Sequence, residues 1–255
     1  MSNIIFLGTG NAFGQAQRYF PGILYSENNC HILFDCGPTI LQALSKTNIN
    51  TSMIHKIVIT HLHGDHFGGL AFFILDRKYQ NPSNENLEIY GGKGLKKRVM
   101  NLIEIMYPKI LEEISKKITF FEIDKDSLIE TNIFEISFHL ANHSEQAFMI
   151  KYYSKTKGVS FIYTGDNELK EDQIIFFKDS KTLITECTTL EPIEGFHTSW
   201  KVLQKCLPKI REVGIEKIFL VHMGHSVIIS KEIDSIQCIE RPYDGDQYCL
   251  SKNSE

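Results

Sequence analysis

The sequence predicts one α/β domain with two β-sheets inside and helices outside. Short apolar runs of strand length alternate with stretches of helical periodicity in both halves of the chain. Strands followed by helices occur twice in succession, and we find no linker, low-complexity run or fixed-period repeat between the halves. We therefore expect residues 1–255 to form a single domain.

Composition is that of an ordinary globular protein. Of the 255 residues, 42 % are hydrophobic and 23 % charged, and the formal net charge is −4. This balance does not favour nucleic acid or anionic membranes, except through a local patch. No apolar run reaches the roughly twenty residues of a membrane span. The N-terminus lacks the basic region of a signal peptide, so we expect a cytoplasmic protein without membrane contacts.

The six cysteines contain no Cys-x-x-Cys pair. Cys36, Cys187 and Cys206 lie in or beside apolar segments, where cysteine behaves as a small buried hydrophobe. A disulfide framework is not expected in a chain of this size, and a reducing compartment fits best.

The first half of the chain predicts strands at 3–7, 23–26, 30–35, 55–60 and 87–90, with a hairpin turn at 27–29. Pro38 suits the first turn of a helix that starts after Asp35-Cys36-Gly37 and continues to the residues around Ile49. Helices are also expected at 67–78 and 95–117, the latter broken near Pro108.

The second half predicts strands at 118–123, 133–140, 148–153, 160–163, 182–185 and 217–221, followed by two short strands around 242–245. In the 133–140 segment, apolar Phe134, Ile136, Phe138 and Leu140 alternate with polar residues, so one face of this strand should be buried. Helical segments are expected at 172–177 and 199–213.

The segment Thr60–Gly69 concentrates metal-binding side chains directly after the apolar run 57–59. Its donors are His61, His63, Asp65 and His66. Imidazole and carboxylate together suit borderline divalent ions such as Zn²⁺, Mn²⁺ and Fe²⁺. In an extended segment, residues 61, 63 and 65 point the same way. Glycines at 64, 68 and 69 then allow the tight path that brings His66 beside them.

Three further donors follow predicted strands. His143 comes after the 133–140 strand, Asp166 after the 160–163 strand and His222 after the 217–221 strand. With the first segment they make five histidines and two aspartates at the mouth of the sheets. Seven such donors are enough for two metal ions that share one carboxylate.

This set resembles the metallo-β-lactamase-fold hydrolases. The resemblance rests on His61-x-His63-x-Asp65-His66, His143, Thr164-Gly165-Asp166 and His222, and extends to Gly8-Thr9-Gly10 and Asp35-Cys36-Gly37. It implies a four-layer αββα metallo-β-lactamase sandwich with a dinuclear site between the sheets. It makes His61, His63 and His143 ligands of one metal ion. Asp65, His66 and His222 would bind the second ion, and Asp166 would bridge the two. We expect two zinc ions, with manganese or iron as alternatives.

Other features resemble the ribonuclease Z and cyclic phosphodiesterase group. His197, preceded by Glu186-Cys187-Thr188, matches a histidine that serves phosphate chemistry outside the metal ligands. The ending 221–225 with Tyr243-Asp244-Gly245 is similar to phosphodiesterases associated with phosphonate breakdown. Residues 10–22 lack the cysteines that form a structural zinc site in those enzymes. Residues 144–165, 22 in number, are too few for the tRNA-gripping arm of the familiar ribonuclease Z.

The resemblance implies a metal-dependent phosphodiesterase that cleaves a small or cyclic phosphodiester. A hydroxide bridging the two metal ions would attack phosphorus in line. His197 would steady the phosphoryl oxygens or protonate the leaving alkoxide. Asp65 and Glu186 complete the expected catalytic set, with Glu186 orienting a histidine.

Three other functions stay open. One is a tRNA 3′-processing endonuclease that grips RNA through residues 93–98 or a partner subunit. Another is a lactone or thioester hydrolase on the same scaffold, and the last is a metal-binding module without catalytic activity. The expected partners are a small phosphodiester substrate, RNA as the alternative, and a second copy in a homodimer. Whether Arg18 or the basic residues within 93–98 contact substrate is left open.

Overall fold

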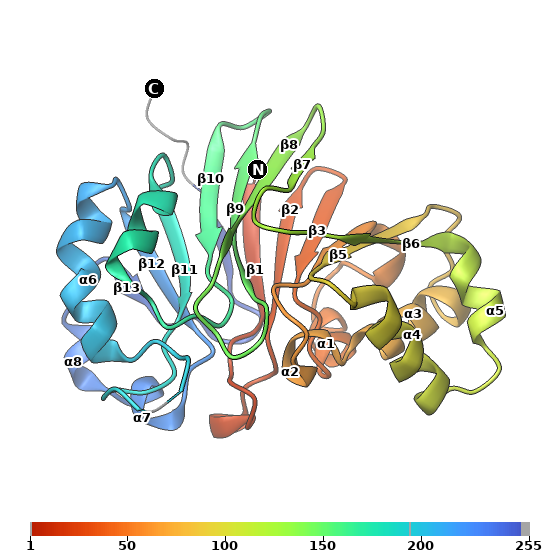
Figure 1. Ribbon diagram of the computed structural model, residues 1–255, viewed down its shortest axis with the longest axis horizontal. Coiled ribbons are helices and arrows are strands. Elements are labelled where there is room, and N and C mark those ends of the chain that lie inside the picture. Colours follow the sequence, from red (N-terminus) through yellow and green to blue (C-terminus); the bar gives the residue numbers. More distant parts are fainter. Residues whose placement is uncertain (1, 194, 251–255) are drawn as a thin grey trace.

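Within residues 2–193 and 195–250, which the computed structural model describes, two seven-stranded β-sheets lie face to face with helices on both outer sides (Figure 1). The first sheet has the order β14-β1-β2-β3-β4-β5-β6. Its strands are β1 (Ser2–Gly8), β2 (Gly22–Glu27), β3 (Cys30–Phe34), β4 (Lys56–Val58), β5 (Leu87–Gly91), β6 (Ile118–Glu122) and β14 (Gln247–Cys249).

The second sheet has the order β13-β12-β11-β10-β9-β8-β7. Its strands are β7 (Leu128–Glu130), β8 (Phe134–Leu140), β9 (Phe148–Ser154), β10 (Val159–Tyr163), β11 (Thr182–Glu186), β12 (Lys217–Val221) and β13 (Ile239–Glu240). Strands β3 to β6 run parallel in the first sheet, and β10 to β13 run parallel in the second. Their carboxyl ends therefore gather at one edge of each sheet, where ligand sites form in open α/β sheets.

The first sheet is covered by α1 (Ile40–Leu44), α2 (Gly64–Phe67), α3 (Leu70–Tyr79), α4 (Leu95–Met106) and α5 (Leu111–Ile114) (Figure 1). The second is covered by α6 (Trp200–Glu212), α7 (His225–Ile228) and α8 (Lys231–Asp234). Short 3₁₀ segments are η1 (Gln15–Gln17), η2 (Thr51–Met53), η3 (Ser115–Lys117) and η4 (Glu171–Phe177). No helix in the described ranges is both long enough and apolar enough to cross a bilayer.

Apolar side chains fill all three spaces between these four layers. Phe34 of the first sheet meets Phe161 of the second edge to face, with ring centroids 5.4 Å apart. Two further clusters fill the space between each sheet and its helices. Full burial of an aromatic side chain stabilises a fold by roughly 1.5–3 kcal/mol, so these clusters hold the sandwich together. The predicted αββα architecture is confirmed.

Several predicted helices and strands differ from those in the structure. The predicted helix after Pro38 ends at Leu44 rather than near Ile49. Thr47 explains the difference, because its hydroxyl donates to the Leu44 carbonyl and accepts from the Ile49 amide, and such local bonds compete with a helix. The 172–177 segment is 3₁₀ rather than α-helical, and strand β7 was not predicted.

The predicted 67–78 helix begins only at Leu70, as α3, and Phe67 instead ends α2. The chain breaks at Gly68–Gly69, between α2 and α3. A Cβ at position 69 would lie 2.1 Å from the Gly37 carbonyl oxygen, so only glycine allows the approach of this segment to the turn after β3. The 95–117 stretch is broken around Pro108 as predicted, and the three cysteines expected in apolar surroundings (Cys36, Cys187 and Cys206) are buried.

Candidate metal centre

The seven predicted metal donors meet at one place between the two sheets. They come from the segment after β4 and from the loops that follow β8, β10 and β12. These donors form two groups whose ligand atoms all lie within 4.8 Å of one another. They are His61, His63, His143 and Asp166, and then Asp65, His66, Asp166 and His222. His222 forms a third such group with Glu186 and His197. Asp166 belongs to both groups, which is the place that the sequence analysis assigned to a bridging carboxylate.

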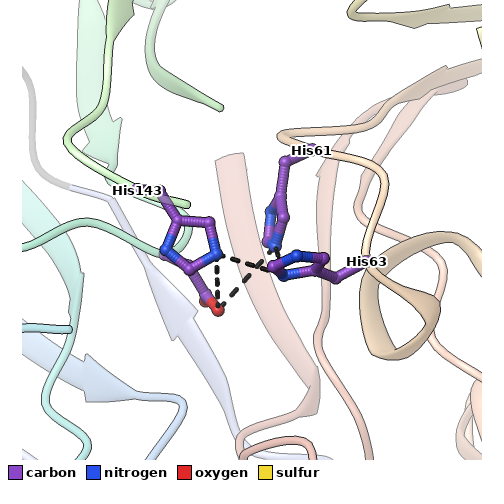
Figure 2. Close-up of side chains that lie close together, drawn as sticks. His61, His63 and His143 are labelled. Atoms are coloured by element: carbon purple, nitrogen blue, oxygen red, sulfur yellow. Dashed lines mark hydrogen bonds and ion pairs between the residues drawn. The ribbon is translucent and has the colours of Figure 1, made fainter. Parts of the chain in front are cut away.

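The first group is a triangle of imidazoles facing a carboxylate. Nδ1 of His63 lies 3.0 Å from Nε2 of His61 and 3.1 Å from Nε2 of His143 (Figure 2). Oδ2 of Asp166 lies 3.8 Å from the His61 nitrogen and 4.0 Å from the His143 nitrogen. The three rings therefore turn nitrogen atoms toward a common point.

The second group is built around the same carboxylate. Nε2 of His66 lies 3.1 Å from Oδ1 of Asp166 and 3.3 Å from Oδ2 of Asp65. Nε2 of His222 lies 3.3 Å from Asp65 and 3.4 Å from Asp166. The two oxygens of Asp166 thus face different histidines.

Hydrogen bonds set the tautomers of His61 and His66. Nδ1–H of His66 donates to Oδ2 of the buried Asp35 at 2.8 Å. The Thr60 hydroxyl donates its single proton to Asp35, so it accepts a hydrogen bond from Nδ1–H of His61, 3.1 Å away. In both rings the Nε2 lone pair is left pointing into the centre.

The same holds for His143 and His222. Nδ1–H of His143 donates to the Phe196 carbonyl oxygen at 3.0 Å. The Thr188 hydroxyl donates to Glu186 and therefore accepts from Nδ1–H of His222 at 3.1 Å. Fixing one ring nitrogen by a donated hydrogen bond is how proteins orient histidine ligands of metals.

This arrangement fits a divalent metal ion. His63 Nδ1 faces two nitrogen atoms that carry lone pairs, and a single proton cannot satisfy both contacts. Nε2 of His66 and Oδ1 of Asp166 are buried and lie 3.1 Å apart, but neither makes a hydrogen bond of regular geometry with a described residue. Buried polar atoms without regular hydrogen bonds are rare and costly, and a bound ion is one of the established reasons for them. The family resemblance and these atoms therefore agree on divalent metal ions.

Charge reinforces the fit. Burial disfavours the ionised form of Asp166, but the imidazoles of His222 and His66 outweigh it and hold its pKa well below the usual range. Burial lowers the pKa of His61, which keeps this ring neutral and able to bind a metal. For His66, burial lowers the pKa, but the negative charges of Asp166 and Asp35 outweigh it and raise the pKa well above its usual range. This position therefore favours a positive charge.

His197 and Glu186, the predicted catalytic pair, lie beside the second group. Nδ1–H of His197 donates to both carboxylate oxygens of Glu186, at 3.1 and 3.2 Å, and the same nitrogen lies 3.8 Å from Asp166. Burial disfavours the imidazolium, yet the bond to Glu186 and the charges of Glu186 and Asp166 raise the pKa of His197 to about 9. Glu186 is fully buried and also accepts from the Asn167 amide.

The path of the first donor segment differs from the expected one. Strand β4 ends at Val58, and Asp65 and His66 lie on the single turn of α2, not in an extended run. Gly64 is not required for this path, because a Cβ there would meet no atom within 4 Å. Gly68 is required, because its Cβ would lie 2.4 Å from the Gly64 carbonyl oxygen.

Asp35 is the site residue that sequence reasoning missed. It accepts hydrogen bonds from the Thr60 amide, the Tyr163 hydroxyl and His66, and its φ of 58° is rare outside glycine. The available signal was its place at the carboxyl end of β3, the same edge as the other donors. Arg18 does not reach the donors, because its guanidinium donates to Thr9 and to the Pro242 carbonyl.

Several known proteins are similar to this chain. Ribonuclease Z from Oceanobacillus iheyensis is 26 % identical over 91 % of this chain and 92 % of its own length. Other ribonuclease Z sequences have a higher identity over a shorter aligned segment. That of Pediococcus pentosaceus is 38 % identical over 58 % of this chain, and the chain covers 46 % of that relative. In this and three further ribonuclease Z relatives, the chain matches about half of the relative's length.

Solved structures show the same fold. Human tRNase Z, short form, superposes with a TM-score of 0.77 at 20 % identity, covering 98 % of this chain and 99 % of that one. A diphosphatase from the PhnP family gives a TM-score of 0.76 at 14 % identity over the full length of both chains. The family model described as anti-Pycsar protein Apyc1 matches residues 2–237. The chain belongs to this anti-Pycsar protein Apyc1 family, among the metallo-β-lactamase-fold hydrolases of the ribonuclease Z and phosphodiesterase group.

Proposed function

We propose that the chain is a dinuclear metal-dependent phosphodiesterase that cleaves a small or cyclic phosphodiester. The observation that carries the proposal is the pair of four-donor groups sharing Asp166, with the His197–Glu186 pair beside them. His61, His63 and His143 would hold one ion, and Asp65, His66 and His222 the other, with Asp166 between them. We propose zinc as the native metal, with manganese or iron as alternatives.

Bound divalent ions would activate a water molecule and neutralise the phosphodiester oxygens, whose charge otherwise repels an attacking anion. The residues of the chain supply the rest. Asp166 and Asp65 bring negative charge into a buried site and balance the cations. Asp35, Thr60 and Thr188 hold the histidine rings, so that little reorganisation is needed on binding.

His197 is the proposed proton donor. Glu186 holds Nδ1, so Nε2 is the ring atom left to face a substrate. A protonated imidazole there can stabilise phosphoryl oxygens and give its proton to the leaving alkoxide. Positive charge from bound ions would lower the pKa of His197 from about 9 toward neutrality, where a general acid works best.

The short segment between His143 and Asp166 favours a small substrate. It contains only the rest of the His143 loop, β9, a turn, β10 and the two residues before Asp166. The site thus lacks, within the described residues, an inserted arm that would grip a large RNA. We also propose that the protein works as a homodimer, which light scattering of the purified chain would test.

The decisive experiment is an assay of the purified chain, stripped of metal and then supplied with Mn²⁺ or Zn²⁺. It should hydrolyse bis(p-nitrophenyl) phosphate and at least one cyclic nucleotide, and His61→Ala should abolish both activities. Lys157→Gln, a change at a half-buried residue outside the donor groups, is the matched control and should remain active. Inactivity with every metal and phosphodiester would overturn the proposal, and hydrolysis of lactones or thioesters alone would reassign the reaction.

A tRNA 3′-processing endonuclease is the second candidate. It is favoured by the similarity to ribonuclease Z along 91 % of the chain. Cleavage of a precursor tRNA at one defined position, faster than cleavage of a small phosphodiester, would establish it. In that case Lys96→Ala and Lys97→Ala, which change exposed residues of α4, should weaken RNA binding and reduce its salt dependence.

A further inference from the structure

We infer that Arg98 positions the two histidine loops of the candidate metal centre against each other. Arg98 lies in the first turn of α4, one of the basic residues considered above as an RNA or phosphate contact. Its Nη1 donates to the Leu62 carbonyl oxygen at 2.9 Å. Leu62 is buried and stands between His61 and His63, so this bond holds the backbone that carries two of the candidate ligands.

The same guanidinium holds the loop of the third histidine. Nη2 of Arg98 donates to Oε1 of Glu145 at 2.7 Å, and Nη1 donates to Oε2 at 3.2 Å. Glu145 is two residues after His143, in the loop between β8 and β9. Paired bonds of this kind fix direction as well as distance, which a lysine could not do.

Neighbouring contacts close the same junction. The Lys93 amide donates to the side-chain oxygen of Gln146 at 3.1 Å, and a Cβ on Gly92 would lie 3.0 Å from that oxygen. The Phe148 amide donates to the Thr60 carbonyl at 3.0 Å and so links the two sheets directly. The segment before α4 is therefore packed against the His143 loop, and Arg98 is its charged connection.

The contribution of this contact should appear in metal binding more than in folding. The side chains of Arg98 and Glu145 are 46 % and 27 % exposed, and ion pairs at such positions contribute roughly 0–1 kcal/mol to stability. A metal site instead requires its ligands within roughly 0.5 Å of the correct geometry. Because His63 Nδ1 lies between the nitrogens of His61 and His143, a shift of either loop separates the ligands.

Arg98 is accordingly a positioning residue and not a substrate contact. The inference rests on the proposed function only in assigning a metal ion to this site. The variants are Arg98→Gln, Glu145→Gln and the double variant, with Lys97→Gln as an exposed control on the same helix. Two quantities are measured: the Mn²⁺ dissociation constant, by competition with a chromophoric chelator, and the melting temperature of the metal-free protein.

Each single variant should weaken Mn²⁺ binding about tenfold, the usual cost of losing a residue that orients a ligand. The double variant should bind no more weakly than Arg98→Gln, because Glu145 contacts this junction through Arg98 while Arg98 also holds Leu62. Lys97→Gln should match the wild type in Mn²⁺ affinity, and the melting temperatures of all metal-free variants should agree within about 4 °C.

Wild-type Mn²⁺ affinity in Arg98→Gln would overturn the inference, as would additive losses in the double variant. A raised KM with unchanged Mn²⁺ affinity would also overturn it, since that pattern belongs to a substrate contact. Wild-type protein that binds Mn²⁺ but cleaves no phosphodiester would remove the proposed function while leaving this inference standing.

Discussion

Replacing Asp35 with asparagine should damage metal binding through the tautomer of His66. Asp35 is fully buried, and one carboxylate oxygen accepts from both His66 Nδ1–H and the Tyr163 hydroxyl. With the other oxygen still accepting from the Thr60 amide, asparagine would turn its NH₂ group toward His66. Nδ1 would then have to accept, and its proton would move to Nε2, the atom that faces Asp65 and Asp166.

The size of the effect follows from these contacts. Binding a metal at Nε2 would require removing that proton, and loss of such an orienting group typically weakens metal affinity by about 10–100-fold. Losing a hydrogen bond to a buried carboxylate should cost about 2 kcal/mol of stability. For a chain of this size that lowers the melting temperature by roughly 4–8 °C.

The assay pairs Asp35→Asn with Glu27→Gln. Glu27 is also a buried carboxylate that accepts from hydroxyl groups, but it ends β2 opposite Cys30, the first residue of β3. It therefore lies roughly 16 Å from Asp35, at 3.3 Å per residue. Mn²⁺ titration and thermal melting of the metal-free proteins separate the two effects. Both variants should lose stability, and only Asp35→Asn should lose metal affinity. Equal metal affinity in the two variants would refute the tautomer argument.

Three further predictions concern pH and metal removal. Glu186→Gln removes the carboxylate that raises the pKa of His197, so the alkaline limb of the pH–rate profile should move to lower pH; an unmoved limb would exclude His197 as the proton donor. The Glu27 carboxylate accepts hydrogen bonds from Thr156, Tyr25 and Ser154, and these bonds outweigh burial and lower its pKa below the ordinary value of about 4.5. The stabilisation by ionised Glu27 is therefore complete above pH 4.5 and is lost as the pH falls through the lower pKa of the folded state. Urea midpoints measured against pH should therefore fall at the acid end in the wild type, and fall less in Glu27→Gln. Chelation of bound metal should lower the melting temperature by roughly 5–10 °C, because ligand at a hundred times its dissociation constant stabilises by about 2.7 kcal/mol, and added Mn²⁺ should restore it; a chelator without effect would count against a resident metal.

The sequence alone was enough to predict the layers, and the seven candidate donors that it singled out do meet at one place. Strands are short and apolar here, and each segment that carries donors comes after one, as His222 follows 217–221. Since parallel strands end at the same edge of a sheet, donors in those positions converge whatever the details of the loops. Glu186 was expected to orient a histidine, and the structure pairs it with His197.

What holds the donors in place was decided only by tertiary structure. Asp35 orients His66 across 31 positions of the chain, and the Phe196 carbonyl orients His143 across 53. Arg98 was considered within 93–98 as a contact for RNA or substrate, yet its guanidinium donates to Leu62 and Glu145. Spacing along the chain predicts where a side chain points only if the element is assigned correctly. Residues 61–65 were expected to be extended, but β4 ends at Val58 and Asp65 lies on α2. Contacts between loops depend on how the two sheets pack against each other, and no local sequence pattern gives the distance between two loops.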